Sequence, residues 1–411
     1  MGQVRWAGWT MAVATALGIS GIQVARADIQ SDRPAAIVVY PRIEVDSGET
    51  ESGEAVNTEI RLTNTNLTAP TLAHCFYLNA NSHCSGGPND GAICTSDPSI
   101  CSGLSFCVPG WQEVDFNILL TPGQPIQWDA RDGLADEDLP LPTGVCINHP
   151  VSACGTDSDC TLFPGLAKCT PSNGGTRIPP VPEDPFIGEL KCIEVDANGV
   201  PVAQNDLKGE ALLEEIETPP SAPDFDVASY NAIGIQSTGA GPSGDPNVLT
   251  LGGPNPEYNG CPNYLILNHF FYDADDPVPG TDAFIETTLT LVPCSEDFLR
   301  QIPGVAVVQY LVFNEFEQRF STSKAVKCFQ DIELCNIDTS NCERSIFSVG
   351  VSGTLTGQTR INPIGVPPLP SGLLGVAKEE HISNSSDHDR SAAFNLHMQG
   401  AREAADTITL P

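Results

Sequence analysis

The sequence predicts an all-β protein with two immunoglobulin-like antiparallel β-sandwich domains, the first carrying two small Cys-rich, disulfide-bonded insertions. Short segments in which apolar and polar residues alternate recur between turn-forming residues, a pattern typical of half-buried strands. The 411 residues include 37 Gly and 35 Pro, which favours many turns. Eight of the 15 cysteines fall in two groups of four, and each group spans 24 residues. Groups that are rich in cysteine and poor in apolar residues predict disulfide-held insertions.

Residues 1–27 have the features of a cleavable export signal. Arg5 supplies a positive charge, residues 7–19 form a short apolar core, and an A-x-A cleavage motif ends at Ala27. The apolar core is too short for an ordinary membrane span, and no later stretch is apolar enough to serve as one. We therefore expect cleavage near Ala27-Asp28. The mature protein is expected to be secreted or periplasmic, with no transmembrane segment.

The first sandwich domain is expected over residues 28–220. Residues 56–63 alternate cleanly, with Ile60 on one face of the strand and Arg61 on the other. Segments of this kind favour an antiparallel sheet with one face in water. The strands expected in this domain cover residues 35–45, 56–63, 72–78, 114–120, 126–128, 186–195 and 211–216.

Two insertions interrupt these strands, and we call residues 84–107 the first knot and residues 146–169 the second knot. Disulfides would have to stabilise them, at about 2–4 kcal/mol per bridge, because neither is apolar enough to bury a core. Zinc is the alternative, but structural zinc sites need closely spaced ligand pairs, and no two knot cysteines are that close. Two disulfides per knot are predicted, with all three pairings open. The knot cysteines are Cys84, Cys94, Cys101, Cys107, Cys146, Cys154, Cys160 and Cys169.

Seven further cysteines lie outside the knots. Cys75 and Cys192 fall on expected strands of the first domain, where a bridge between them would clamp two strands or two sheets. Cys261 and Cys294 each border an expected strand of the second domain. Because the total of 15 is odd, at least one thiol is unpaired or bridges to a partner. We expect that cysteine to be one of the last three, Cys328, Cys335 and Cys342.

The second sandwich domain is expected over residues 221–361, after a Pro-rich linker. Residues 362–411 are expected to form a Pro-rich and then polar C-terminal segment, in which only residues 392–398 and 407–410 have the character of ordered elements. The strands expected in the second domain cover residues 225–236, 264–272, 284–292, 305–313 and 319–329, with a hairpin over 346–361.

The net charge of −33 constrains the partners. Nucleic acid is excluded as an expected partner, because binding it requires a basic face. Calcium is the cation that such a chain could attract, and loop aspartates are suitable ligands for it. The candidates are the acidic run after the strand at 264–272 and two aspartates of the second knot, namely Asp273, Asp275, Asp276, Asp157 and Asp159. The alternative interpretation is that these residues are solvated turn aspartates.

No sequence motif of a known catalytic class stands out, with no nucleophile elbow, zinc-protease helix, phosphate loop or dinucleotide fingerprint. We therefore expect a non-enzymatic surface or extracellular module that binds a protein or glycan partner, or that is structural. The projecting knots would be available for contacts. No cofactor is expected apart from a possible calcium ion.

An extracellular hydrolase is the second hypothesis, with a carboxylate or metal site near residues 269–276. It requires His269 and carboxylates such as Asp273, Glu286 and Glu315 to meet in one cleft. A binding module would instead scatter these residues and display an apolar or aromatic patch. His269 has the parity of its strand, so a hydrogen-bonded core histidine is the alternative role for it.

Overall fold

The computed structural model confirms an all-β protein, with 57% strand and 5% helix. Within the ranges that it describes, no helix is both long and apolar enough to span a membrane. Those ranges are 31–48, 55–95, 98–134, 144–146, 149–153, 161, 169–171, 178–217, 224–240, 244–275, 283–364, 372–383, 390–398 and 402–411.

The prediction of two immunoglobulin-like sandwich domains is wrong. The strands are arranged as a five-bladed β-propeller with several small antiparallel sheets. The larger sheets combine strands that are far apart in the chain. Alternation in a sequence identifies strands and their faces, but it does not say which strands pair across long connections. This is why the strands were predicted and their assembly was not.

The first half of the chain supplies most of two neighbouring sheets. Tyr77 of one sheet and Trp128 of the other meet in a shared hydrophobic core, where the Trp128 indole N–H donates to the Tyr77 hydroxyl at 2.7 Å. The first sheet has the order β14 (Ile233–Ile235), β1 (Ile37–Val45), β11 (Phe186–Val195), β3 (Thr71–Asn79) and β6 (Gln112–Leu120). The second has the order β13 (Asp224–Asn231), β12 (Leu207–Glu217), β2 (Ala55–Asn64) and β7 (Pro125–Asp129).

Two further sheets lie in the second half. One has the order β21 (Arg319–Lys327), β20 (Val305–Asn314), β23 (Thr356–Ile364), β16 (Leu265–Phe270) and β26 (His397–Met398). The other has the order β17 (Ala274–Asp275), β18 (Ala283–Pro293), β24 (Leu373–Ser383) and β25 (Arg390–Asn395), with β22 (Gln330–Glu333) paired to β18. β24 pairs with β18 along its length, although β24 lies in the segment 362–411 that the sequence predicts to be Pro-rich and polar.

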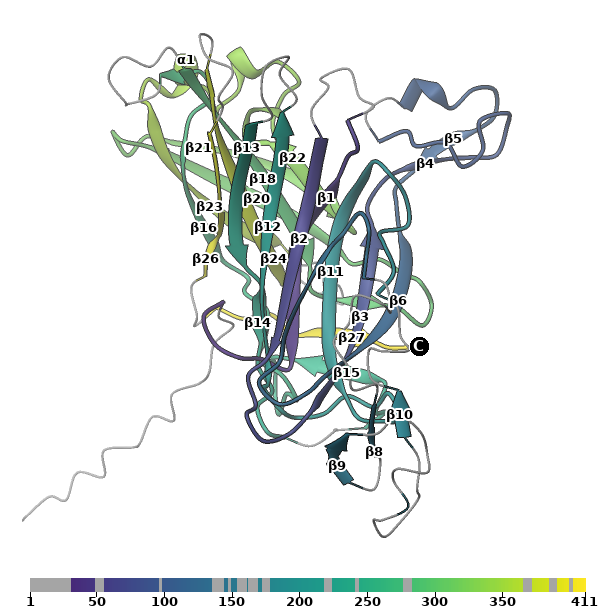
Figure 1. The fold of residues 1–411 in the computed structure, drawn as a ribbon. Helices are drawn as coiled ribbons and strands as arrows, with labels where there is room; N and C mark the ends of the chain where they lie inside the picture. The colour runs from purple at the N-terminus through teal and green to yellow at the C-terminus, as the bar shows by residue number, and fades with distance from the viewer. Residues whose placement is uncertain are drawn as a thin grey trace, which may run out of the picture.

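Small sheets complete the structure. One consists of β15 (Val248–Leu251), β27 (Asp406–Thr409) and β19 (Glu296–Asp297). The first knot contains β4 (His83–Ser85) and β5 (Phe106–Val108), and the second contains β8 (Gly144–Cys146), β9 (His149–Ala153) and β10 (Cys169–Pro171). In Figure 1 these two knot sheets lie toward opposite ends of the molecule.

The two halves of the chain are joined through strands and through the core. The expected boundary at residues 220/221 falls between β12 and β13, which pair along their length, and β14 pairs with β1. One hydrophobic cluster contains Ile37 and Ile193 from the first half together with Val292 and Ile408 from the second. Burying these side chains together stabilises both halves at once.

A buried ion-pair network also crosses between the halves. The Arg42 guanidinium of β1 donates to Glu44 at 2.6 Å, contacts Asp331 of β22 and donates to the Thr290 hydroxyl of β18 at 3.2 Å. Arg42 is 5% exposed, so these partners replace the water that it loses on folding.

Candidate functional site

An open cavity of about 840 Å³ lies over one face of the sheet formed by β20, β23 and β16. Its volume falls within the range of small-molecule sites in proteins. Most of the lining residues are polar, and they include three carboxylates, one arginine and several amides. It consists of Asn268, His269, Phe270, Phe313, Asn314, Glu315, Glu317, Thr356, Gly357, Gln358, Arg360 and Glu379.

Strand register builds the floor of this cavity. Gln358 of β23 lies opposite Asn268 of β16 on one side and Phe313 of β20 on the other. The Gln358 side-chain amide donates from Nε2 to the side-chain Oδ1 of Asn268 at 3.0 Å. The Arg360 guanidinium lies 4.6 Å from the centre of the Phe313 ring, a cation–π contact. An amide pair, a cation and an aromatic ring therefore share one surface.

The turn between β20 and β21 forms one rim. The buried Asn314 side chain organises this turn by accepting from the backbone N–H groups of Phe316 and Gln318, at 3.0 and 2.9 Å. Glu315 accepts from the Thr356 hydroxyl at 2.7 Å and from its backbone N–H at 3.3 Å. Glu315 is therefore held against the end of β23.

His269 is buried beneath the cavity, at 3% exposure, as its strand parity predicts. Its Nδ1 lies 2.9 Å from the Phe270 carbonyl oxygen and its Nε2 lies 2.8 Å from the Thr359 hydroxyl. Burial lowers the pKa of His269 to about 4, so the ring is neutral near pH 7. With both nitrogens engaged, the ring has the features of a structural histidine.

Glu286 lies elsewhere, beside a separate cavity of about 10 Å³ that Tyr272 and Glu333 also line. Burial and the neighbouring Glu333 and Glu380 raise the pKa of Glu286 to about 7. A space of this size holds about one water molecule, which is too small for a substrate. The structure thus brings His269 and Glu315 to one cavity and separates Glu286 from it.

Of the five calcium candidates, Asp273 alone has a described side chain. Asp273 has a positive φ of 63° and lines neither cavity. Asp275 is described only through its backbone in β17, and Asp276, Asp157 and Asp159 lie outside the described residues. The calcium site therefore stays a prediction.

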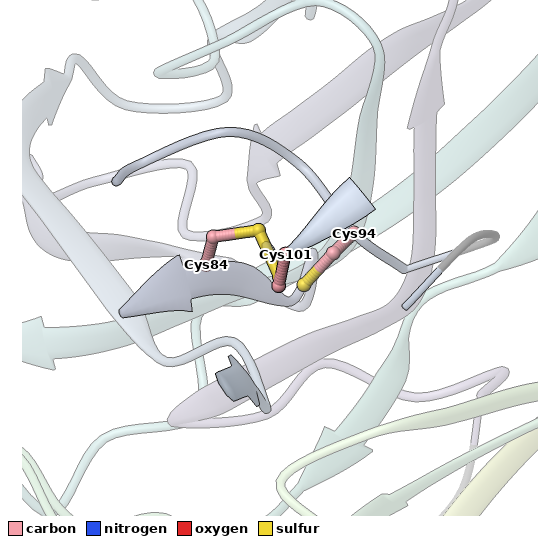
Figure 2. A group of neighbouring side chains, drawn as sticks. All are labelled: Cys84, Cys94 and Cys101. Carbon is pink, nitrogen blue, oxygen red and sulfur yellow. A yellow bond between two sulfur atoms is a disulfide. The ribbon is translucent and has the colours of Figure 1, made fainter. Parts of the chain in front are cut away.

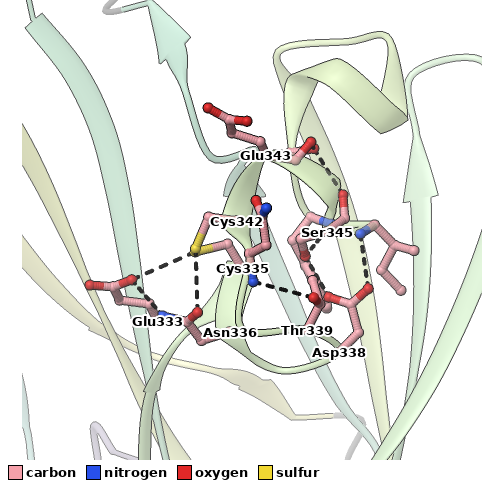
Figure 3. Close-up of a disulfide and its surroundings, with 12 residues drawn as sticks. Glu333, Cys335, Asn336, Asp338, Thr339, Cys342, Glu343 and Ser345 are labelled. Carbon is pink, nitrogen blue, oxygen red and sulfur yellow. Dashed lines mark hydrogen bonds between the residues drawn. A yellow bond between two sulfur atoms is a disulfide. The ribbon is translucent and has the colours of Figure 1, made fainter.

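Three groups of potential metal ligands occur in the described part of the chain, and each contains cysteines that form a disulfide. Figure 2 shows the first, in which Cys84 is bonded to Cys101 and Cys94 lies nearby. Figure 3 shows another, the Cys335–Cys342 disulfide beside Glu333. The third contains the Cys261–Cys294 disulfide and Asp406. Sulfur in a disulfide carries no thiolate to bind zinc.

The first knot is held by crossed disulfides, from Cys84 to Cys101 and from Cys94 to Cys107. Its first and last cysteines lie opposite each other in the β4–β5 register. In the second knot, Cys146 and Cys169 lie opposite each other in the β8–β10 register. The two knots therefore share the placement of their outer cysteines.

The remaining described cysteines follow the expectation. Cys75 and Cys192 are opposite each other in β3 and β11 and form a disulfide. Cys328 is the free cysteine of the described residues, and it belongs to the expected group of three. Burial, with Glu296 and Glu189 nearby, raises the pKa of its thiol well above the usual value. It therefore remains a protonated thiol.

Exposed apolar side chains lie close together in the sequence at the end of the first knot. We call Ile100, Leu104, Phe106 and Val108 the knot patch. Their exposed fractions are 40%, 92%, 73% and 46%. Ile100, Leu104 and Phe106 lie between Cys94 and Cys107, which one of the crossed disulfides joins, and Val108 directly follows Cys107. A cluster of exposed apolar residues on a rigid loop is a feature of interaction surfaces.

Sequence reasoning missed most of the cavity floor and the knot patch. Gln358 and Arg360 alternate with the buried Thr359 and Ile361. This alternation predicts that Gln358 and Arg360 lie on an exposed face of the strand, but it does not predict which residues of other strands lie beside them. Neither a scan against protein-family models nor a search of the curated proteins finds a match for this chain. Its function must therefore be argued from these surfaces.

Proposed function

We propose that this chain is an exported, disulfide-stabilised, non-enzymatic module that binds a protein partner through the knot patch. The observation that carries the proposal is the exposure of Leu104 and Phe106 on a loop fixed by two disulfides. A fixed loop loses little conformational freedom when it binds, which favours affinity. Aromatic and large aliphatic side chains supply most of the energy of protein interfaces.

Export is supported by two features. Residues 1–27 have the charge, apolar core and cleavage motif of a signal peptide. Disulfides persist in oxidising compartments and are rare in the cytosol. The strongly negative charge then keeps the exported protein soluble and directs binding to the uncharged knot patch.

The hydrolase hypothesis finds less support. A carboxylate mechanism needs two carboxyl groups facing each other across a substrate cleft. In the large cavity, Glu315 is engaged by Thr356 and the histidine below it is neutral and fully bonded. Glu286, whose pKa is raised, lies beside a space too small for a substrate.

A glycan is the second candidate ligand, and the cavity floor favours it. Paired amides beside an aromatic ring provide hydrogen bonds and a stacking surface for a sugar. Gln358→Ala should abolish binding to any glycan that the wild-type protein retains on a glycan array, and Gln127→Ala, on a different sheet, should not. Equal loss in both variants would contradict a glycan site here.

Site-specific photo-crosslinking tests the knot patch. A photoreactive amino acid replaces Leu104 in one variant and Leu67 in a control, because Leu67 is 82% exposed but lies outside the knot. Illumination of cells that export each variant should give an adduct of defined mass from position 104 and none from position 67. Absence of an adduct at 104, or the same adducts at both positions, would refute the proposal.

A further inference from the structure

Two lysines in this protein are each buried with two glutamates. In the first group, which we call the inner triad, Lys191 of β11 contacts Glu296 of β19 and lies 3.6 Å from Glu189 of its own strand. In the second, the outer triad, Lys378 of β24 contacts Glu215 of β12 and lies 2.7 Å from Glu380. Each lysine thus faces one glutamate from a distant segment and one that is two residues away on its own strand.

The inner triad is dry. The side chains of Lys191, Glu189 and Glu296 are 2%, 3% and 0% exposed. Lys191 Nζ lies 5.6 Å from the centre of the Phe298 ring, which stacks on Phe76 at 4.4 Å. The Phe298 ring therefore lies over the amine, and the small exposed fractions of the three side chains indicate that bulk water does not reach them.

The burial of this cluster limits how many of its three groups can be ionised. Three ionised groups would leave a net negative charge in a site without water, which is costly. Burial and the neighbouring Glu296 raise the pKa of Glu189 well above the usual value, so Glu189 keeps its proton. Both oxygens of Glu189 and Oε1 of Glu296 find no hydrogen-bond partner among the described residues. A proton held between the two carboxyl groups would pair one oxygen of Glu189 with Oε1 of Glu296.

The amine of Lys191 and the two carboxyl groups therefore share two titratable protons. One arrangement is an ammonium, a carboxylate and a carboxylic acid. The other is a free amine and two carboxylic acids, and it is reached by moving one proton from Lys191 to Glu296. Burial on its own lowers the pKa of Lys191, but Glu189 and Glu296 outweigh burial and raise that pKa above the usual value. The uncharged arrangement is therefore the minor one, and a low-dielectric site populates it more than water does because it has no charges.

We propose that Lys191 and Glu296 condense into an intramolecular isopeptide bond, with Glu189 as the residue that relays the proton. The free amine attacks Cδ of the Glu296 carboxyl group, and a C–N bond forms. Glu189 accepts a proton from the nitrogen and returns one to the departing hydroxyl, which leaves as water. One amine and one carboxylic acid give one amide and one water, so no oxidant, metal or cofactor is needed.

The geometry supplies the driving force. Reactive groups that are held in contact behave as if at very high concentration, which replaces external activation. The amide product removes an ion pair whose desolvation is unfavourable. The bond would join residues 105 positions apart in the chain, and so link the first half to the second.

The outer triad is an internal control. The side chains of Glu215 and Glu380 are 20% and 28% exposed, so water reaches both carboxylates. Hydration stabilises the charged arrangement, in which the lysine is no nucleophile. Lys378 and Glu215 are therefore expected to remain an ion pair.

Intact mass spectrometry of the purified mature protein, fully reduced and denatured, tests the proposal. The expected mass is lower than the sequence mass by one water molecule, and digestion should release a branched peptide that joins the segments around residues 191 and 296. A mass equal to that of the sequence, or loss of water at any other pair, would overturn the proposal.

Two variants examine the roles of the glutamates. Glu296→Gln should form the same branched peptide with loss of ammonia in place of water. Glu189→Gln keeps both reacting groups and the shape of the site, but it should leave the amine and carboxyl group unreacted. A branched peptide at the wild-type level in Glu189→Gln, in protein whose circular dichroism matches the wild type, would exclude the relay role.

Discussion

The inner and outer triads contain the same three side chains in similar arrangements, and they differ in their access to water. Both place a lysine against a glutamate from a distant strand and beside a second glutamate on its own strand. The side chains of the inner triad are at most 3% exposed, whereas the carboxylates of the outer triad are 20% and 28% exposed. Residue identity alone therefore does not set the chemistry of such a cluster. We propose that burial decides whether such a cluster remains an ion pair or condenses.

Replacing each lysine in turn should give the largest difference in unfolding free energy between the two triads. Lys191→Met leaves two carboxyl groups without a partner in a dry site, so we expect a loss of unfolding free energy of at least about 3 kcal/mol. Lys378→Met leaves partly hydrated carboxylates, and the expected loss is about 1–2 kcal/mol. Urea unfolding monitored by fluorescence measures both. Equal losses would remove the distinction between the triads.

Two disulfides allow the stability contributed by a covalent link between distant segments to be compared with that of a local link. The Cys75–Cys192 bond lies next to Lys191 and spans 117 positions, whereas Cys335–Cys342 spans 7. Replacing the first pair by alanine should cost about 5 kcal/mol and the second about 2 kcal/mol, because the longer loop restricts the unfolded chain more. Thermal unfolding at neutral pH tests this order. A larger effect from the local pair would contradict it.

Glu194 shows how burial changes the pKa of a carboxyl group that is not paired with a lysine. It lies on the same strand as Lys191, is fully buried and accepts from the Asp206 backbone N–H at 3.1 Å. Burial and the neighbouring Asp206 raise the pKa of Glu194 from 4.5 to about 9.

The folded state therefore holds a proton that the unfolded chain releases above about pH 4.5, so stability falls as the pH rises toward about 9. Glu194→Gln should flatten this fall and raise stability at pH 9 by about 2 kcal/mol. Melting temperatures from pH 5 to 9 check the slope. The exposed Glu317→Gln is the control, and an unchanged slope in Glu194→Gln would refute the assignment.

The smallest effect on stability is expected at the knot patch. Leu104→Ser and Phe106→Ser alter side chains that are 92% and 73% exposed. Stability should change by less than about 0.5 kcal/mol, because neither side chain leaves the core. Differential scanning calorimetry measures this. A large loss of stability would show that the patch packs against the protein in solution and is not free to bind.

The sequence predicted local features more successfully than the assembly. Alternation identified the strands around Ile60 and His269, and the cysteine spacing identified the disulfides of the first knot. It could not choose among three pairings, because each satisfies the spacing equally. The immunoglobulin-like arrangement failed because strand pairing between distant segments, such as β18 with β24, leaves no periodic signal.

The triads were missed for a related reason. Glu189 and Lys191 occupy alternate positions in β11, which is the pattern of a strand with one face in water. In the structure, that face is covered by residues such as Phe298. Lys378 lies in a segment that was expected to be polar, and its buried environment depends on Glu215, which is 163 positions away.

Peptide mapping of both lysines in one digest of the mature protein compares the two triads in a single experiment. Burial is predicted to drive condensation at the inner triad alone. We therefore expect a branched peptide containing residues 191 and 296, and linear peptides containing Lys378 and Glu215. Linear peptides at both triads, or branched peptides at both, would contradict it.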